Sequence, residues 1–331
     1  MSQKFTHGYA VIIGVGADLP ITIDDAQAVA NFLHDPARCA YPAEQVQLLT
    51  GETARRDHIL TALDRLAEQV QADPEATAVV YFSGHGLETP NYYLMPFGYD
   101  QADLAKTAIS GDEFTTRLRA IQAKKLLVLL DCCHAGGQAE AKTLPGVKSP
   151  LPASVITELG QSSGRVIIAS SRKDELSFAF KDKHPYSVFT VALLEALAGY
   201  GASEQDGYAR VLDTAMWVGR KVPELSDDRQ HPIVKVSGLE DNFAVAYYAA
   251  GDKSPQKLDW TASMPSMTSD VNENQIISWQ RRLKSRRRAL MLIEERMNDY
   301  IEYQKIPLQL IDNKYRTEED IAKLEQYLGL R

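Results

Sequence analysis

Continuous apolar runs of strand length recur through the first half of the chain, and amphipathic segments separate them. The runs are Tyr9–Val15, Val46–Leu49, Ala78–Phe82, Lys125–Leu130 and Arg165–Ala169. A strand that is apolar on both faces belongs to a sheet covered on both sides, as parallel sheets are. Helical spacing of apolar residues follows these runs, for example at Arg55–Gln71. We therefore predict an α/β sandwich with a mostly parallel central sheet flanked by helices.

The 331 residues divide into three parts by composition. Residues 1–250 carry the strand and helix pattern and form the predicted α/β domain. Residues 251–275 are rich in Ser, Asp, Pro and Met and are typical of a linker. Residues 276–331 are predicted to form a C-terminal α-helical segment.

Apolar residues in the C-terminal segment follow a helical pattern with one interruption. Between Ile276 and Tyr300 they recur at intervals of three and four, with Arg286 standing in the apolar seam. Pro307 should end or kink this helix, and Thr317 with Asp320 predicts the start of a last helix. A helical hairpin results. Its narrow apolar stripe would suit a regulatory protein partner, and pairing within the chain alone is an equal alternative.

Six basic residues occupy the eight positions from Arg281 to Arg288. Such a run can bind nucleic acid or an acidic partner. The chain as a whole carries a net charge of −8, and no aromatic residues interleave the run. We favour a solvated helix face whose long side chains cover apolar surface, and we expect no nucleic-acid partner.

Cysteine usage and hydropathy indicate the compartment. The three cysteines, Cys39, Cys132 and Cys133, have no spacing typical of a disulfide framework or a zinc site. There is no apolar run long enough to span a membrane, and the N-terminus lacks a signal-peptide pattern. We expect a cytoplasmic protein without membrane contact.

Two motifs follow the two most apolar runs. Tyr81–Gly86 reads YFSGHG, and Leu130–Gly137 reads LDCCHAGG. A histidine and a cysteine at the ends of separate core strands, about fifty residues apart, are an arrangement found in cysteine peptidases. The pair matters because an imidazole can take the proton of a thiol, which is mostly protonated at neutral pH.

These motifs predict acyl transfer by His85 and Cys133. Cys133 would attack a peptide carbonyl, and His85 would act as base and then protonate the leaving amine. Backbone N–H groups of Gly86 and Cys133 would bind the oxyanion, where one donor is typically worth about 3 kcal/mol.

From about residue 9 to residue 248 the sequence resembles the caspase-like clan, and most closely its metacaspase and bacterial orthocaspase branch. The resemblance rests on the YFSGHG and DCCHAG motifs, with weaker support from Ala169-Ser170-Ser171 and Gln230-His231-Pro232. It implies a caspase-like fold and places the nucleophile directly before the histidine, at Cys133. Strand alternation then directs Cys132 into the core.

The resemblance also implies substrate preference. By position, Asp25, Ser83 and Asp131 match the pocket that holds the P1 side chain, the residue before the scissile bond, in metacaspases. A buried carboxylate pair is matched by a guanidinium, so the expected reaction is cleavage of proteins after Arg or Lys. The alternative for Asp25 is that it only caps its helix.

Related enzymes can require self-cleavage or calcium. Basic residues that could serve as self-processing sites are Lys142, Lys148 and Arg165. The acids Asp100, Asp112, Glu113 and Glu140 are scattered and lack the spacing of a calcium loop. We therefore predict no metal or cofactor and leave calcium activation open.

Two alternatives to the peptidase are a dinucleotide-binding fold and a non-catalytic scaffold. Gly14-Val15-Gly16 follows a strand, but Leu19 stands where a dinucleotide motif needs its third glycine, so that fold is rejected. The second is a non-catalytic caspase-like scaffold that binds partners through its pocket and helical tail. Presence of both His85 and Cys133 favours the enzyme. Helical tails in bacterial relatives suggest regulation by a partner, with a role in immunity, such as antiviral defence, or in programmed cell death.

Overall fold

The structure is a computed structural model. It describes residues 5–17, 19–89, 91–133, 164–172, 175, 185–248, 273–298, 308–328 and 330. Its central element is an eight-stranded sheet, of which six strands follow the order β2-β1-β3-β6-β7-β9; β4 pairs with the last residues of β3, and β5 pairs with β4. The strands are β1 (Gly8–Gly14), β2 (Val46–Thr50), β3 (Thr77–Thr89), β4 (Asn91–Leu94), β5 (Ile109–Ser110), β6 (Lys125–Cys133), β7 (Arg165–Ala169) and β9 (Ile233–Ser237). β8 (Tyr208–Arg210) and β10 (Ala244–Tyr247) form a separate antiparallel pair.

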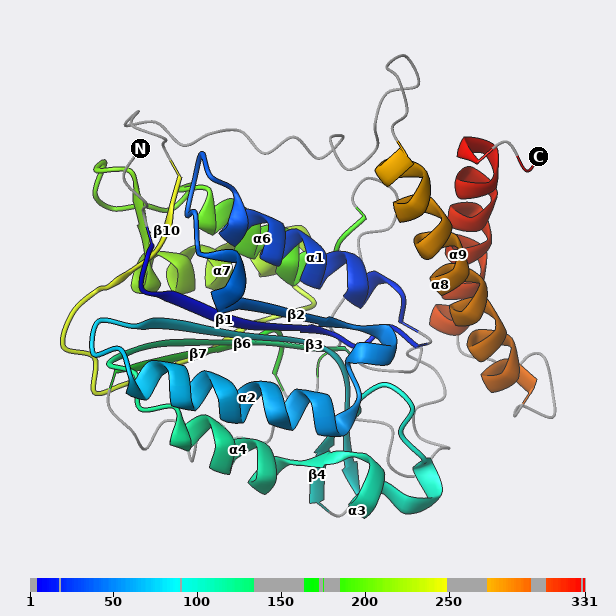
Figure 1. Cartoon of the computed structure of the whole chain (residues 1–331), viewed down its shortest axis with the longest axis horizontal. Coiled ribbons are helices and arrows are strands. Elements are labelled where there is room, and N and C mark those ends of the chain that lie inside the picture. Colours follow the sequence, from blue (N-terminus) through cyan, green and yellow to red (C-terminus); the bar gives the residue numbers. More distant parts are fainter. Residues whose placement is uncertain are drawn as a thin grey trace.

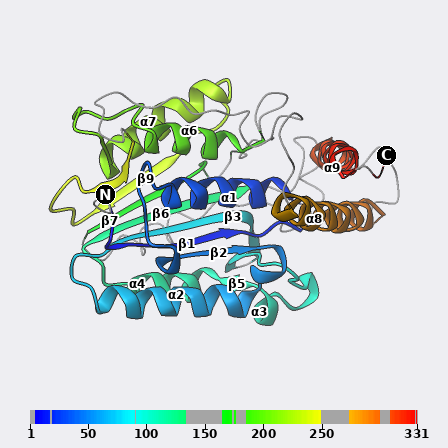
Figure 2. The same cartoon turned by 45° about the horizontal axis from the view of Figure 1, so that its top comes forward.

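Helices cover both faces of this sheet (Figures 1 and 2). One face carries α1 (Ile21–His34), α6 (Val188–Leu197) and α7 (Val211–Leu225); the other carries α2 (Arg56–Gln71) and α4 (Gly111–Ala120), and the short α3 (Leu104–Thr107) lies near β5. Alternate residues of each core strand enter opposite clusters. Ile12 packs with α1 and α6, whereas its neighbour Ile13 packs with α2. This explains why the strands are apolar throughout.

Parallel pairing dominates the sheet, as predicted. β1 pairs in parallel with β2 and β3, and β6 pairs in parallel with β3 and β7. β9 is antiparallel to β7, at the sheet edge. β3 and β6 continue past the apolar runs that predicted them, so His85 and Cys133 lie within paired strands and not in loops after them.

Gly14 permits a close approach between the first strand and the first helix. A Cβ at this position would lie 2.2 Å from the carbonyl oxygen of Thr22 and 2.7 Å from Ala26 Cβ. Any larger residue would push α1 away from the carboxyl end of β1. The glycine therefore sets the position of the helix turn that carries Asp25.

The C-terminal segment contains α8 (Glu273–Asn298) and α9 (Leu308–Tyr327), which pack against each other. Leu283 meets Ile321 and Leu324, whereas Ile293 and Met297 meet Leu310, so the two helices are antiparallel. The hairpin lies at one end of the sandwich (Figure 1). The prediction of a helix start at Thr317 is wrong: α9 begins at Leu308, and Thr317 is buried inside it.

The division of the chain at residues 250 and 275 stays a prediction, because residues 249–272 lie outside the described ranges. Among the described helices, none is both long and apolar enough to cross a bilayer.

Candidate active site

The histidine and cysteine motifs meet where β3 pairs with the carboxyl end of β6. The parallel register of the two strands pairs Ser83 with Asp131, Gly84 with Cys132 and His85 with Cys133. Neighbouring strands lie about 4.8 Å apart, so the backbones of His85 and Cys133 are adjacent. His85 is buried, with 7% of its surface exposed. The Cys133 side chain lies outside the described part of the structure.

Three features fix the position of the histidine segment. The backbone N–H of Met95 donates to the carbonyl oxygen of His85 at 3.0 Å. A Cβ on Gly84 would lie 2.7 Å from Val15 Cγ2, so only glycine fits beside β1 at this point. Gly86 pairs with Leu94 of β4. The strand is therefore fixed on both sides of His85.

Cys132 is part of the core, as strand alternation predicted. It is buried in the apolar cluster beneath α2 and α4. Burial raises the pKa of its thiol to about 12. Burial also raises the pKa of Cys39 to about 12. Neither thiol is a nucleophile at neutral pH, which leaves Cys133 as the candidate.

The structure brings Asp25, Ser83 and Asp131 to the same edge of the sheet, all of them fully buried. Ser187 links the two acids: its hydroxyl donates to Asp131 Oδ2 at 2.6 Å and its backbone N–H donates to Asp25 Oδ1 at 2.9 Å. Residues from α1, β3, β6 and the start of α6 thus form one polar group.

Two carboxyl groups share this buried site. Burial raises the pKa of Asp25 well above its ordinary value, the nearby Asp131 raises it further, and the Ser187 N–H opposes the rise. Burial and the two acids likewise raise the pKa of Tyr81, whose hydroxyl bonds Thr190 at 2.8 Å. Asp25 Oδ2 and Ser83 Oγ have no hydrogen-bond partner among the described residues. A cation would satisfy these atoms and relieve the repulsion.

The alternative that Asp25 only caps its helix is wrong. α1 begins at Ile21, so Asp25 lies within the helix. Its carboxylate accepts a hydrogen bond from the Ser187 backbone N–H. Pro20 precedes α1 and makes no side-chain cap bond, whereas Ser187 caps a different helix, α6, where its hydroxyl accepts from the Thr190 backbone N–H at 3.0 Å.

Sequence reasoning did not find Ser187 and Thr190. The sequence signal was a serine just before an apolar helix, which predicts a cap and nothing more. The contact of Ser187 with Asp131 spans 56 residues of chain and depends on how α6 packs on the sheet.

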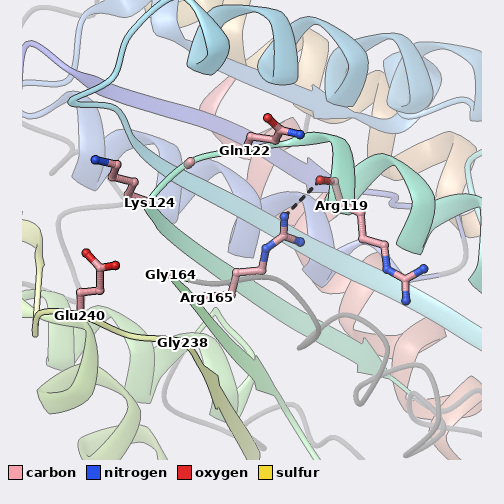
Figure 3. A pocket seen from close by; sticks show the side chains of 8 residues that line it. Arg119, Gln122, Lys124, Gly164, Arg165, Gly238 and Glu240 are labelled. Atoms are coloured by element: carbon pink, nitrogen blue, oxygen red, sulfur yellow. Dashed lines mark hydrogen bonds between the residues drawn. The ribbon is translucent and has the colours of Figure 1, made fainter.

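Arg165 does not fit the predicted role of a self-processing site. It begins β7, is 2% exposed, and is paired through the backbone with both β6 and β9. Figure 3 shows its guanidinium pointing to Arg119, whose carbonyl it meets at 3.2 Å, and it also reaches the Ile121 carbonyl at 2.9 Å. A peptide bond inside a buried strand cannot enter a protease cleft. Lys142 and Lys148 lie outside the described residues.

Two of the acids considered for calcium, Asp100 and Glu113, have other partners. Glu113 binds Arg56 through both carboxylate oxygens, at 2.7 and 2.8 Å, and Asp100 accepts from the Ala102 backbone N–H. In the described ranges, no group of three or more His, Cys, Asp or Glu residues gathers in a way that could hold a metal ion. Glu140 lies outside the description, and calcium activation stays an open prediction.

A sequence model of the caspase domain, peptidase C14, matches residues 7–244. No curated protein sequence matches the chain significantly. A solved structure similar to this chain is the crystal structure of protein GSU0716 from Geobacter sulfurreducens, with 18% sequence identity and a TM-score of 0.46, covering 71% of this chain and 94% of that chain. Because the caspase-domain match spans most of the residues, the chain belongs to the caspase-domain family of cysteine peptidases.

Proposed function

We propose that the protein is a cysteine endopeptidase that cleaves after Arg or Lys. The observation that carries the proposal is the register pair His85–Cys133 directly beside the buried Asp25–Asp131 group. The first supplies a base and a nucleophile, and the second supplies negative charge for a cationic side chain. The metacaspase-like preference is inferred from this charge.

The chemistry proceeds through an acyl-enzyme. His85 accepts the Cys133 proton, and the sulfur attacks the peptide carbonyl carbon to give a tetrahedral oxyanion. Backbone N–H groups of Gly86 and Cys133 stabilise that oxyanion. As the C–N bond breaks, His85 protonates the leaving amine, and water then hydrolyses the thioester with His85 acting again as base.

Substrate selection follows from the pocket's electrostatics. A P1 guanidinium or ammonium next to Asp25 and Asp131 would favour the ionised form of Asp25 and pair with both carboxylates. A neutral P1 side chain would not stabilise the ionised form of Asp25, and an acidic one would add a further negative charge to the site. Ser83 Oγ, which has no partner among the described residues, offers a further hydrogen bond.

A peptide library tests the proposal. The wild type should cleave after Arg and Lys, His85→Ala should lose about 10²–10⁴-fold in turnover, and Cys133→Ala should lose all measurable turnover. Cys132→Ala is the matched control, because it removes the neighbouring buried thiol and should retain the P1 preference.

Iodoacetamide provides an independent measurement, since it should alkylate Cys133 and stop cleavage of an arginine-terminated fluorogenic peptide. No Cys133-dependent turnover with any peptide would favour the scaffold alternative. Regulation by a protein partner of residues 276–331, self-processing at Lys142 or Lys148, and a role in immunity or cell death remain predictions.

A further inference from the structure

Arg286 explains the interruption in the apolar seam of α8. It is 6% exposed and its guanidinium binds Asp24 of α1. The buried Arg286 side chain of α8 therefore contacts the peptidase domain. A charge in an apolar seam is costly unless it is paired, so this position is built for that contact.

Arg288, about half a turn further along α8, makes a second contact with the domain. It binds Glu52 and lies over the Phe97 ring, with its Cζ 5.5 Å from the centroid. Arg287, between them, binds Glu325 of α9 at 2.8 Å. Consecutive arginines therefore hold α8 to the domain and to its hairpin partner.

Both acidic acceptors lie at the carboxyl edge of the sheet. Asp24 is the neighbour of Asp25 in the first turns of α1, and Glu52 follows the end of β2 in a short 3₁₀ turn, Gly51–Thr53. Figures 1 and 2 show α8 beside this end of the sandwich. The hairpin is thus attached one residue away from the proposed P1 pocket.

The attachment is ionic. Within the described residues, the apolar clusters of the hairpin contain only α8 and α9 side chains, and those of the peptidase domain contain none from the hairpin. The exposed Arg288–Glu52 pair weakens in salt, whereas the buried Arg286–Asp24 pair depends on both partners being present. Loss of one partner can therefore release α8 without disturbing the apolar core of either part.

We propose that α8 is an autoinhibitory element, held by Arg286 and Arg288 against the substrate-binding edge. The Arg286 charge beside Asp24 repels a cationic P1 side chain, and the docked helix narrows access to the Asp25–Asp131 pocket. Release of α8 then raises the rate of cleavage after Arg or Lys. This consequence rests on the proposed function, whereas the docking itself does not.

The test compares Arg286→Glu with Lys284→Glu, the same charge change at an exposed residue of the same helix. Hydrogen exchange of α8 backbone amides in the full chain reports docking, and kcat/KM for an arginine-terminated peptide reports activity. Arg286→Glu should raise exchange and increase kcat/KM by about three- to tenfold, whereas Lys284→Glu should change neither. The double variant Asp24→Arg with Arg286→Glu should restore slow exchange by reversing the pair.

Different outcomes separate the parts of the proposal. Unchanged exchange in Arg286→Glu would overturn the docking contact. Faster exchange with unchanged or lower kcat/KM would overturn autoinhibition. Absence of turnover in every variant, including the wild type, would instead contradict the proposed function while the exchange data still decide the docking.

Discussion

Ionisable side chains are buried at both ends of the central strands, but they have different kinds of partner at each end. At the carboxyl end, Asp25 and Asp131 lie together, and burial and mutual repulsion raise the pKa of Asp25. At the amino end, Arg165 lies beside a cavity of about 340 Å³ and donates to the carbonyls of Arg119 and Ile121. These carbonyls stand at the end of α4, where a helix leaves acceptors unpaired.

The difference distinguishes a structural charge from a functional one. The Arg165 guanidinium donates to carbonyl groups at the C-terminal end of α4, where the helix dipole favours a cation. Its hydrogen-bond partners are therefore backbone groups of the protein itself. Asp25 has another acid as its neighbour and one oxygen without a hydrogen-bond partner in the described residues. These features fit the proposed role of the site in binding a cationic side chain.

The largest expected effect is on substrate choice at the carboxyl end. Asp131→Asn keeps the shape and can still accept from the Ser187 hydroxyl, but it removes a charge that a P1 cation would pair with. We expect kcat/KM for an arginine peptide to fall by about 10²-fold, or about 3 kcal/mol. A neutral P1 peptide serves as the control and should lose far less; an equal loss on both peptides would remove the pocket role of Asp131.

An intermediate effect is expected on stability, from a substitution at the amino end of the central strands. Arg165→Met leaves the Arg119 and Ile121 carbonyls without their donor, and should lower the free energy of unfolding by about 2 kcal/mol. The ratio of cleavage after Arg to cleavage after a neutral residue should stay the same. Urea denaturation and the peptide ratio measure the two quantities, and a changed ratio would argue against a purely structural role.

The smallest expected effect is the dependence of the free energy of unfolding on pH. Because the pKa of Asp25 is raised in the folded state, the native protein keeps a proton that the unfolded chain loses above about pH 4. Stability should therefore fall with rising pH through that window, by at most about 1.4 kcal/mol per pH unit for this group. The difference in unfolding free energy between wild type and Asp25→Asn isolates it.

The affinity for an arginine peptide should change with pH in the opposite direction to stability. An arginine peptide prefers the ionised Asp25, so its affinity should rise with pH until Asp25 is fully ionised. Calorimetry on Cys133→Ala avoids cleavage during the measurement. A pH-independent affinity, or the same pH dependence after Asp25→Asn, would show that Asp25 does not face the P1 side chain.

Much of the sheet follows from local pattern. The run Arg165–Ala169 coincides with β7, and the run Val46–Leu49 falls within β2, because buried parallel strands are apolar on both faces. β9 was missed because Val234 and Val236 are exposed at the edge of the sheet and alternate with polar neighbours. The start of α9 was misplaced because Thr317 resembles a cap in sequence but is buried in the hairpin.

The sequence by itself determined the five core strands, the two motifs and the family resemblance, because these depend on residues close together in the chain. Only the tertiary structure decided that His85 is paired with Cys133, that Ser187 bridges Asp25 and Asp131, and that Arg286 reaches Asp24. Each of these contacts joins distant segments, and its existence depends on strand register and helix docking. Those are set by the packing of the whole molecule, which local spacing does not encode.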